Sequence, residues 1–538
     1  MQPTRYTDQI TAAEWRWVTV WATALSLLTL LPFVLVPLIL PGPDATFMGI
    51  LHDPEGAVSG LASMRLGERG EWLWRDLYTP EPQNGAISDV IYVVLGQAAR
   101  VINLEPLALF HIARVLAAMF MFHAFYVLSA AIWTKLNTRR IFWFVASVGG
   151  GLGWIAAPLL RQLTPDIQFS TIFPFHAALA NIHLSLAVGC IAFLAAAMLD
   201  SMRPGSYAMP AVSNSGLTLI VFSVTLALLY PQAFVPMGIT YALLLALDAR
   251  RRSVYGRNAQ WFMWFIVPPL PLLAYILIVT VSNPVVMEIW QLGSAASVPP
   301  PHMLLIALGL PLIFALPGLW RAIRRFEPDG SAFMLVWLAA MLLLAYLLPV
   351  IRGKYLLGLM IPIAYFVARS AEDFWFPRVT DRRWRWRLIA AVAPLIVASN
   401  AVALVIPLAS AERLTLPADY ADSFNFLRGR PAAGVVVASG PVGWWLPSWT
   451  GQQTVYASSR LTLDASAKAA AIRQFYGAQS EADCDALLDG EVSKGEPFRV
   501  RYVLLGPIER SIGGAAPCLD DMIGLAHFGS VSVYLAPR

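Results

Sequence analysis

The sequence predicts a multi-pass α-helical membrane protein, with its N-terminus inside and its C-terminus outside, and with a C-terminal α/β domain. Three observations support this fold class. Of the 538 residues, 58% are hydrophobic and only 13% are charged, whereas a typical soluble domain has about 25% charged residues. The apolar residues form runs of about 20, which is the length that spans a bilayer. Lys and Arg gather between these runs, so the net charge of +5 follows membrane topology and does not indicate nucleic-acid binding.

Eleven apolar runs are predicted to span the membrane. They cover 14–40, 106–133, 141–160, 177–199, 216–230, 233–248, 260–280, 303–320, 331–350, 354–370 and 387–408. The first run is too long for a signal-peptide core, and no small-residue cleavage site follows it, so we expect a retained anchor. Pro231 interrupts the apolar sequence between the fifth and sixth runs, where we expect a turn or kink.

The basic clusters set the orientation of these spans. With the N-terminus and its Arg5 and Arg16 in the cytoplasm, the even-numbered spans end in cytoplasmic loops, and each of these loops contains Lys or Arg. The loops are 135–140, 200–205, 248–257, 321–330 and 376–387. Loop 281–302, on the opposite side, has no Lys or Arg. This topology places residues 41–105 and the chain from about 411 onward outside the cytoplasm.

The apolar run 85–104 is excluded from the count of spans. Counting it would reverse every later loop and place the basic clusters outside. Its Asp89 and Arg100 fit an amphipathic helix at the outer interface, or one packed in the bundle, better than a lipid-facing span.

The chain changes character after residue 410. Short β-branched segments at 434–440, 453–459, 498–506 and 530–538 predict strands, and segments 464–477 and 481–492 predict helices. This alternation indicates a small α/β domain, so we divide the chain into a membrane domain, 1–410, and an external domain, 411–538. Cys190 lies in an apolar run and Cys484 and Cys518 lie in the tail, so at most one disulfide can form within the chain.

Ionisable residues near the outer face are functional candidates, because burying charge at a membrane costs free energy. The candidates are Asp53, Glu55, the turn 75–82, Asp166, His176, His183, Glu288, His302 and the segment 352–355. They come from different loops, yet all belong to one face of the membrane in the predicted topology, which favours a shared site.

Asp53 and Glu55 form the acidic pair that follows the first span. Two carboxylates at this spacing can converge on a divalent cation such as Mg²⁺ or Mn²⁺, or one can act as a general base. Pro54 fixes its own φ and favours an extended conformation at Asp53. The simpler alternative is a solvated loop.

Basic and polar residues at the same face suit an anionic ligand. Arg352 and Lys354 lie at the outer end of two spans, against the positive-inside bias, and suit a lipid phosphate; the alternative is snorkelling to the headgroups. His176 and His183 are seven residues apart and share a helix face, where histidines hydrogen-bonded inside the bundle are the alternative. Gln232, in a predicted turn, can line a cavity.

Four segments carry a resemblance to a known enzyme superfamily. They are "DPE" (53–55), "GLASMRLGERGEWLWRDLYTPEP" (60–82), "FHIARVLAAMFMFHAFYVL" (110–128) and "RGKYLLGLMIPIAYFVARS" (352–370). They resemble the acidic motif, the short helix with its Pro-rich turn, the Arg-containing second span and the late R-x-x-Y span of GT-C membrane glycosyltransferases. Protein mannosyltransferases and aminoarabinose lipid A transferases belong to that superfamily. The tail, with "YVLLGPIE" (502–509), is also similar to the tails of such enzymes.

The resemblance implies a role for each matching residue. Asp53 would be the general base that deprotonates the acceptor, and Glu55 would assist it or bind a divalent metal ion. Arg352, with Lys354 or Tyr355, would hold the phosphate of a polyprenyl-phosphate sugar donor. The sugar would pass, with inversion, to a protein, glycan or lipid acceptor on the outer face of the cell membrane.

Two features depart from the superfamily pattern. Pro54 separates the acids, which are adjacent in many members, and the turn "TPEP" has Glu81 where the family usually has Lys. The subfamily and the use of metal therefore stay open. We count Glu81, Asp166, His176, His183 and Gln232 as candidate substrate-binding residues.

Two other classes of protein were weighed against the enzyme. A transporter or lipid flippase would carry charges near span centres and an internal repeat, whereas this chain has few mid-span charges and no repeat. A non-catalytic assembly subunit would use the external domain to bind a partner. Sugar transfer by an Asp53→Asn variant separates the enzyme from both.

Overall fold

The computed structural model describes residues 10–39, 44–202, 214–252, 255–294, 298–326, 330–348, 352–409, 411–432, 434–492, 497–514 and 516–537. Arg5 and the side chain of Arg352 lie outside the described part. The chain forms two compact units. The first unit comprises Met1–Pro32, Ile112–Tyr275 and Ser294–Pro407, and the second comprises Phe33–His111, Ile276–Gly293 and Leu408–Arg538.

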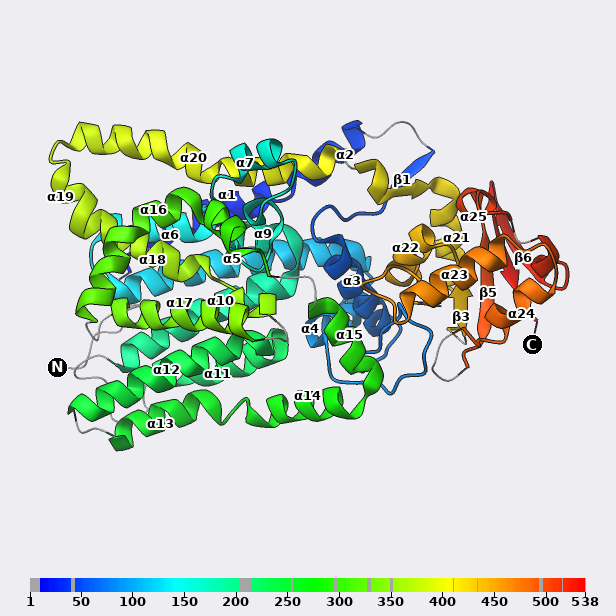
Figure 1. Cartoon of the computed structure of the whole chain (residues 1–538), viewed down its shortest axis with the longest axis horizontal. Coiled ribbons are helices and arrows are strands. Elements are labelled where there is room, and N and C mark those ends of the chain that lie inside the picture. The colour runs from blue at the N-terminus through cyan, green and yellow to red at the C-terminus, as the bar shows by residue number, and fades with distance from the viewer. Residues whose placement is uncertain are drawn as a thin grey trace. The chain divides into compact units, whose positions relative to one another are not determined.

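Helices occupy every predicted span (Figure 1). The long ones are α1 (Ala12–Leu28), α5 (Pro106–Ile132), α6 (Leu136–Val148), α10 (Ile182–Ser201), α11 (Asn214–Leu229), α12 (Pro231–Arg252), α13 (Tyr255–Ile266), α14 (Leu270–Ser282), α16 (Pro301–Arg325), α17 (Gly330–Leu347), α18 (Met360–Ser370) and α20 (Arg382–Ala409). In the described part of the chain, seven helical segments are long and apolar enough to cross a bilayer, or eight if α13 and α14, bent by 44°, count as one span. The multi-pass helical class is therefore confirmed, while the count of eleven spans stays a prediction.

Short helices connect the long ones. They are α2 (Leu31–Ile39), α7 (Gly153–Leu160), α8 (Pro165–Gln168), α9 (Pro174–Ala180), α15 (Pro284–Ser294), the 3₁₀-helix η3 (Arg352–Leu356), the π-helical turn η4 (Ala371–Trp375) and α19 (Phe376–Arg378). The predicted span 354–370 is thus divided, because Gly358 has a φ of 80° and separates η3 from α18.

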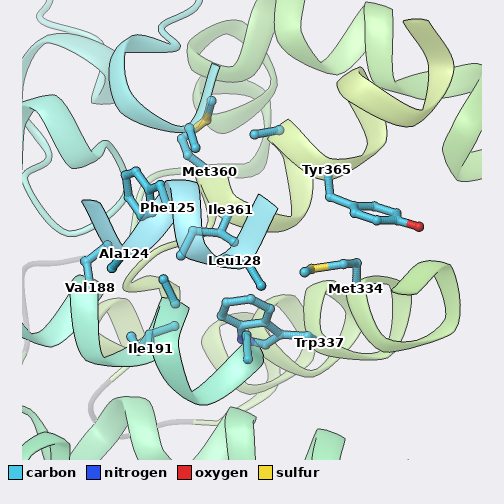
Figure 2. Close-up of a cluster of buried hydrophobic side chains, with 14 of the residues drawn as sticks. Ala124, Phe125, Leu128, Val188, Ile191, Met334, Trp337, Met360, Ile361 and Tyr365 are labelled. Atoms are coloured by element: carbon cyan, nitrogen blue, oxygen red, sulfur yellow. The ribbon is translucent and has the colours of Figure 1, made fainter. Parts of the chain in front are cut away.

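The core of the first unit lies among α5, α10, α17 and α18. Figure 2 shows Phe125, Leu128, Trp337, Met360 and Ile361 gathered there, and all five are buried. Packing of this kind places α18, and the η3 segment that precedes it, against fixed neighbours.

One buried ion pair joins three helices of the first unit. Glu14 of α1 accepts hydrogen bonds from Arg139 of α6 (2.9 Å) and from the hydroxyl of Tyr126 in α5 (2.7 Å). Glu14 also completes a capping box with Thr11 at the start of α1. A buried carboxylate is stable only when paired and hydrogen-bonded in this way.

Two helices of the second unit cross at a pair of glycines. They are α3 (Pro54–Glu68) and α4 (Val90–Ile102), and α4 confirms that the excluded run 85–104 is helical. A Cβ on Gly96 would overlap the carbonyl oxygen of Met64, and a Cβ on Gly67 would overlap that of Val93. The absence of a side chain lets the two backbones touch.

The tail forms a five-stranded sheet in the order β4-β3-β5-β7-β6, in which β3 runs parallel to β4 and β5 and the other pairs are antiparallel (Figure 1). The strands are β3 (Val435–Val437), β4 (Gln453–Thr454), β5 (Val500–Leu505), β6 (Ile523–Phe528) and β7 (Val531–Leu535). The helices are α21 (Ala418–Arg428), α22 (Gly440–Thr450), α23 (Ala465–Tyr476), α24 (Ala482–Leu488), α25 (Pro507–Arg510) and α26 (Ala516–Leu519). A separate two-stranded ribbon pairs β1 (Ala45–Phe47) with β2 (Thr415–Pro417), after the short 3₁₀-helix η5 (Ala411–Leu414).

The predicted C-terminal α/β character is confirmed. All four predicted strands and both predicted helices are present, although β3, β4 and α24 are shorter than expected. The structure adds β6, α21, α22, α25 and α26, which were not predicted. A disulfide joins Cys484 of α24 to Cys518 in α26, and Cys190 is buried and free.

Candidate active site

Asp53 is the last residue before α3, and its side chain is exposed. Its backbone is left-handed, with φ 42° and ψ 58°, so the extended conformation expected from Pro54 is wrong. Pro54 occupies the first turn of α3, where its fixed φ suits the helix, and Asp53 enters the helix from a left-handed conformation. Asp adopts the left-handed region more readily than most residues. This backbone conformation sets the direction in which the side chain of Asp53 leaves the main chain.

Glu55 lies in the first turn of α3, two residues after Asp53. Its carboxylate forms an ion pair with Arg460 of the tail, with 3.0 Å between Oε2 and Nη1. Both side chains are partly exposed, at 34% for Glu55 and 60% for Arg460. The acidic pair therefore has a guanidinium beside it, which the sequence did not predict.

A cluster of four charges holds the other end of α3. Arg65 and Glu68 of α3 pair with each other, Arg65 pairs with Glu105, and Arg428 of α21 pairs with both glutamates. Arg65 also donates to the carbonyl of Ser448 in α22 (3.1 Å). These contacts fix α3 against the tail and so define where the helix presents its acidic N-terminus.

The turn that follows α3 is hydrogen-bonded to β4 and to the segment between β4 and α23. The amide of Thr454 donates to the carbonyl of Leu77 (2.9 Å), and the hydroxyl of Thr462 donates to that of Tyr78 (2.8 Å). The side chain of Gln453 donates to the carbonyl of Thr79. Three successive carbonyls of the turn thus bond to the tail.

Glu81 is almost fully buried in an ion pair with Lys468 of α23, whose side chain has no exposed surface. Lys468 also donates to the hydroxyl of Thr79 (3.2 Å), which in turn donates to Glu81. Burial lowers the pKa of Lys468, and the neighbouring Glu81 counteracts that shift. Glu81 is a predicted substrate-binding residue, and in the structure its carboxylate is paired with the buried Lys468. The Ala-rich sequence around Lys468 is typical of a surface helix, and nothing in it predicts that Lys468 is buried.

Asp76 is a second buried acid in the same turn. Its carboxylate accepts from the amide of Tyr78 (2.8 Å), while its own backbone amide and carbonyl bond to the side chain of Gln83. Burial raises the pKa of Asp76 to about 7, the amide of Tyr78 opposes this, and the charges of Asp89 and Glu81 add to it. Burial is thus the main cause of the raised pKa of Asp76.

The first unit brings several predicted basic and polar residues together. The η3 segment packs against α12 and α17, and the amide of Gly358 after it donates to the carbonyl of Thr171 (3.0 Å). Lys354 and Tyr355 are partly exposed, and Lys354 interacts electrostatically with His183 at the start of α10. Arg352 begins the same segment.

His183 lies parallel to the ring of Tyr230, with 6.4 Å between ring centroids. Tyr230 directly precedes α12, whose second residue is the largely buried Gln232. The predicted break at Pro231 therefore separates α11 from α12 and places an aromatic ring beside His183. Tyr230 was not a predicted site residue, although its position in the "YPQ" turn is a signal that could have indicated it.

Asp166 and His176 lie in the interior of the first unit. Asp166 has no exposed surface and accepts hydrogen bonds from the amides of Gly151 (3.0 Å) and Gly153 (2.9 Å) and from the hydroxyl of Ser399 (2.6 Å). It thereby ties the loop before α7 to α20. His176 is buried in α9. The geometry of Asp166 gives it a structural role, and it lies apart from solvent.

Arg114 is a fully buried cation in α5. It donates to the carbonyls of Ala178 (2.7 Å) and Leu179 (3.2 Å) at the end of α9, and to the hydroxyl of Thr29 (3.1 Å). A cation at a helix C-terminus is favoured by the helix dipole. Arg114 therefore stabilises the break between α9 and α10, just before His183.

The acidic pair is a poor match to the ligand set of a metal site. In the part of the chain that the structure describes, no three His, Cys, Asp or Glu side chains are placed to hold a metal ion. Glu55, one of the two predicted ligands, pairs with Arg460 instead. The residues present thus favour a guanidinium, and not a divalent cation, at Glu55.

No protein-family model matches the sequence, and no curated protein matches it. Solved structures do match the fold. The archaeal oligosaccharyltransferase AglB from Archaeoglobus fulgidus, in complex with an inhibitory peptide and a dolichol-phosphate, aligns with a TM-score of 0.54 and 10% identity, over 92% of this chain and 70% of that one. ArnT from Cupriavidus metallidurans, bound to undecaprenyl phosphate, aligns with a TM-score of 0.53 and 15% identity, over 98% of this chain and all of that one.

The arabinofuranosyltransferase AftD from Mycobacteria aligns with a TM-score of 0.55 and 15% identity, over 97% of this chain but only 40% of AftD. All three are membrane glycosyltransferases of the GT-C type. This chain therefore shares its fold with these three glycosyltransferases, and the fold that the resemblance predicts is confirmed.

Proposed function

We propose that the chain is an integral membrane glycosyltransferase, which moves a sugar from a polyprenyl-phosphate donor to an acceptor on the extracytoplasmic side. The observation that carries the proposal is the fold match to ArnT, which covers 98% of this chain and the whole of an enzyme solved with undecaprenyl phosphate. The exposed Asp53 at the start of α3 supplies the carboxylate that such a reaction needs.

The reaction is one displacement at the anomeric carbon. The carboxylate of Asp53 takes the proton of the acceptor hydroxyl as the oxygen attacks, a new carbon–oxygen bond forms, and the bond to the lipid phosphate breaks. The configuration of the sugar inverts. The proton stays on Asp53 until solvent removes it, and the polyprenyl phosphate leaves with the bonding electrons.

The leaving phosphate gains negative charge in the transition state, and cations that meet it there lower the barrier. Lys354, with Arg352 and Tyr355 of the same η3 segment, is proposed to bind this phosphate. His183 lies within electrostatic reach of Lys354, and its neighbour Tyr230 covers it on one side. Gln232 belongs to the same group of residues at the start of α12.

Binding of undecaprenyl phosphate tests the donor site. The purified protein in nanodiscs should bind this lipid, measured by native mass spectrometry, and Lys354→Ala should weaken binding. Lys135→Ala is the matched control, because Lys135 is an exposed lysine paired with Glu372 near the predicted cytoplasmic end of α6. Equal binding by Lys354→Ala and the wild type would remove Lys354 from the donor site. Absence of binding by the wild type would contradict the proposed donor class.

The disulfide between Cys484 and Cys518 supports an extracytoplasmic tail, because such bonds persist in oxidising compartments. Labelling of single cysteines with a membrane-impermeant maleimide tests this orientation. Ser511→Cys in the tail should react in intact spheroplasts, whereas Thr380→Cys, in a predicted cytoplasmic loop, should react only after lysis. Both positions are exposed. The reverse pattern would overturn the orientation.

A further inference from the structure

Hydrogen bonds and an ion pair on the neighbouring residues hold Arg460 beside Glu55. Arg460 lies in the segment between β4 and α23, 405 residues after Glu55 in the chain. On one side of it, the buried Thr462 bonds to the amide of Ala457 (3.0 Å) and to the carbonyl of Tyr78 (2.8 Å). These bonds close a short loop around Arg460 and attach it to the turn that follows α3.

The chain that follows Thr462 is fixed as well. Asp464, with a φ of 48°, turns the chain into α23, and Lys468 in the first turns of that helix forms the buried ion pair with Glu81. Before Arg460, Gln453 and Thr454 bond to the carbonyls of Thr79 and Leu77. The segment that carries Arg460 is therefore held on both sides by contacts with residues 77–81. Its guanidinium meets Glu55 because of these anchors, even though the ion pair itself is exposed.

Arg460 occupies Oε2 of Glu55, so a divalent cation could reach this carboxylate only through Oε1 and would lie beside the positive charge of the guanidinium. Mg²⁺ in proteins is held by one or two carboxylates together with substrate phosphates. With Glu55 paired to Arg460, Glu55 cannot bind such an ion through both of its oxygens. The fixed positive charge also offsets one of the two negative charges of the pair, which a metal ion would otherwise do.

We propose that Arg460 is the resident cation of the acidic pair: it positions Glu55 and takes the place of a divalent cation there, so that Asp53 acts as base without a metal bound by Glu55. This inference rests on the proposed function. It makes Arg460 a positioning residue, and it makes the tail a part of the active site and not an independent binding module.

Binding of Mn²⁺, followed by electron paramagnetic resonance in nanodiscs, tests the inference without any substrate. Arg460→Ala should bind Mn²⁺ about fivefold more tightly than the wild type, the ratio expected for loss of an exposed ion pair. Arg460→Lys should bind Mn²⁺ as the wild type does. Arg460→Ala combined with Glu55→Gln should lose the tighter Mn²⁺ binding of Arg460→Ala. Arg473→Ala, an exposed arginine of α23, is the matched control and should change nothing.

Sugar transfer supplies the second measurement. The wild type should keep its rate in EDTA, whereas Arg460→Ala should slow and recover in part with added Mn²⁺, and Arg460→Lys should stay close to the wild type. Wild-type Mn²⁺ binding as tight as that of Arg460→Ala would overturn the inference, and so would loss of wild-type transfer in EDTA. A wild type that transfers no sugar would contradict the proposed function alone, because Mn²⁺ binding still decides the role of Arg460.

Discussion

Glu81 and Lys468 form a buried ion pair although 387 residues separate them along the chain. Glu81 comes from the Pro-rich turn after α3, and Lys468 comes from α23 of the tail. Burial removes both charges from water, so each depends on the other and on the hydroxyl of Thr79 for its solvation. The ion pair therefore links the turn after α3 to the tail within the second unit.

Removing one partner of this pair should be costly. Lys468→Ala leaves the carboxylate of Glu81 buried without its cation, which typically destabilises a protein by about 3–5 kcal/mol. We expect a marked fall in the melting temperature of the purified protein. Lys468→Met combined with Glu81→Leu should recover most of that loss, since no charge stays buried. Lys135→Ala removes an exposed ion pair and should change the melting temperature little.

The protonation of Asp76 should make stability depend on pH. Its pKa is raised from 3.8 to about 7, so the folded protein holds this proton up to about pH 7, while the unfolded chain releases it above about pH 4. Stability should therefore fall as pH rises from 4 to 7, by up to roughly 4 kcal/mol, and then level off.

Asp76→Asn tests this expectation because Asn is neutral at every pH and can still accept from the amide of Tyr78. The variant should match the wild type at pH 4 and have the higher melting temperature at pH 8. A difference between the two proteins that is the same at pH 4 and pH 8 would contradict the raised pKa.

Local patterns in the sequence were enough to predict most elements of the fold. The apolar runs between basic loops locate the long helices, because hydrophobic length and charge act within one segment. The β-branched segment 498–506 likewise predicts β5. Segment 440–450, with its two prolines and two glycines, reads as a loop but forms α22, since Pro441 fits the first turn of a helix. The exposed strand β6 lacks the apolar alternation that would have indicated it.

Contacts across the chain could not be predicted in the same way. The partners of Glu55 and Glu81 are both in the tail, and no spacing rule links positions 405 and 387 residues apart. Asp166 looked like a site residue because it is an acid near a predicted outer boundary, yet its three hydrogen bonds make it a buried anchor. Lys354 and His183 interact within the first unit, and their placement on the outer face of the membrane stays a prediction.

The crossing of α3 and α4 should tolerate no side chain at Gly96. Gly96→Ala would force its Cβ into the carbonyl of Met64, and a backbone atom cannot move aside as a flexible side chain can. We expect a fall of several degrees in melting temperature and loss of transfer activity, because α3 carries Asp53. Gly524→Ala is the control: that position is open, with nothing within 4 Å of the added atom, and the change should be neutral.

Asp53→Asn should abolish sugar transfer while leaving the fold and lipid binding intact. A general base typically contributes a factor of about 10²–10⁴ to a rate, so we expect the rate to fall by at least about 100-fold. Asn adopts the left-handed conformation as readily as Asp, and the φ of 42° at this position can be kept. Asp89→Asn is the matched control, because Asp89 precedes α4 with the same left-handed backbone. Undecaprenyl phosphate should bind both variants as it binds the wild type, which separates a lost base from a lost donor site. If Asp53→Asn transferred sugar at the wild-type rate with saturating donor, another group would have to accept the proton of the acceptor, and Asp53 would return to being a solvated loop residue.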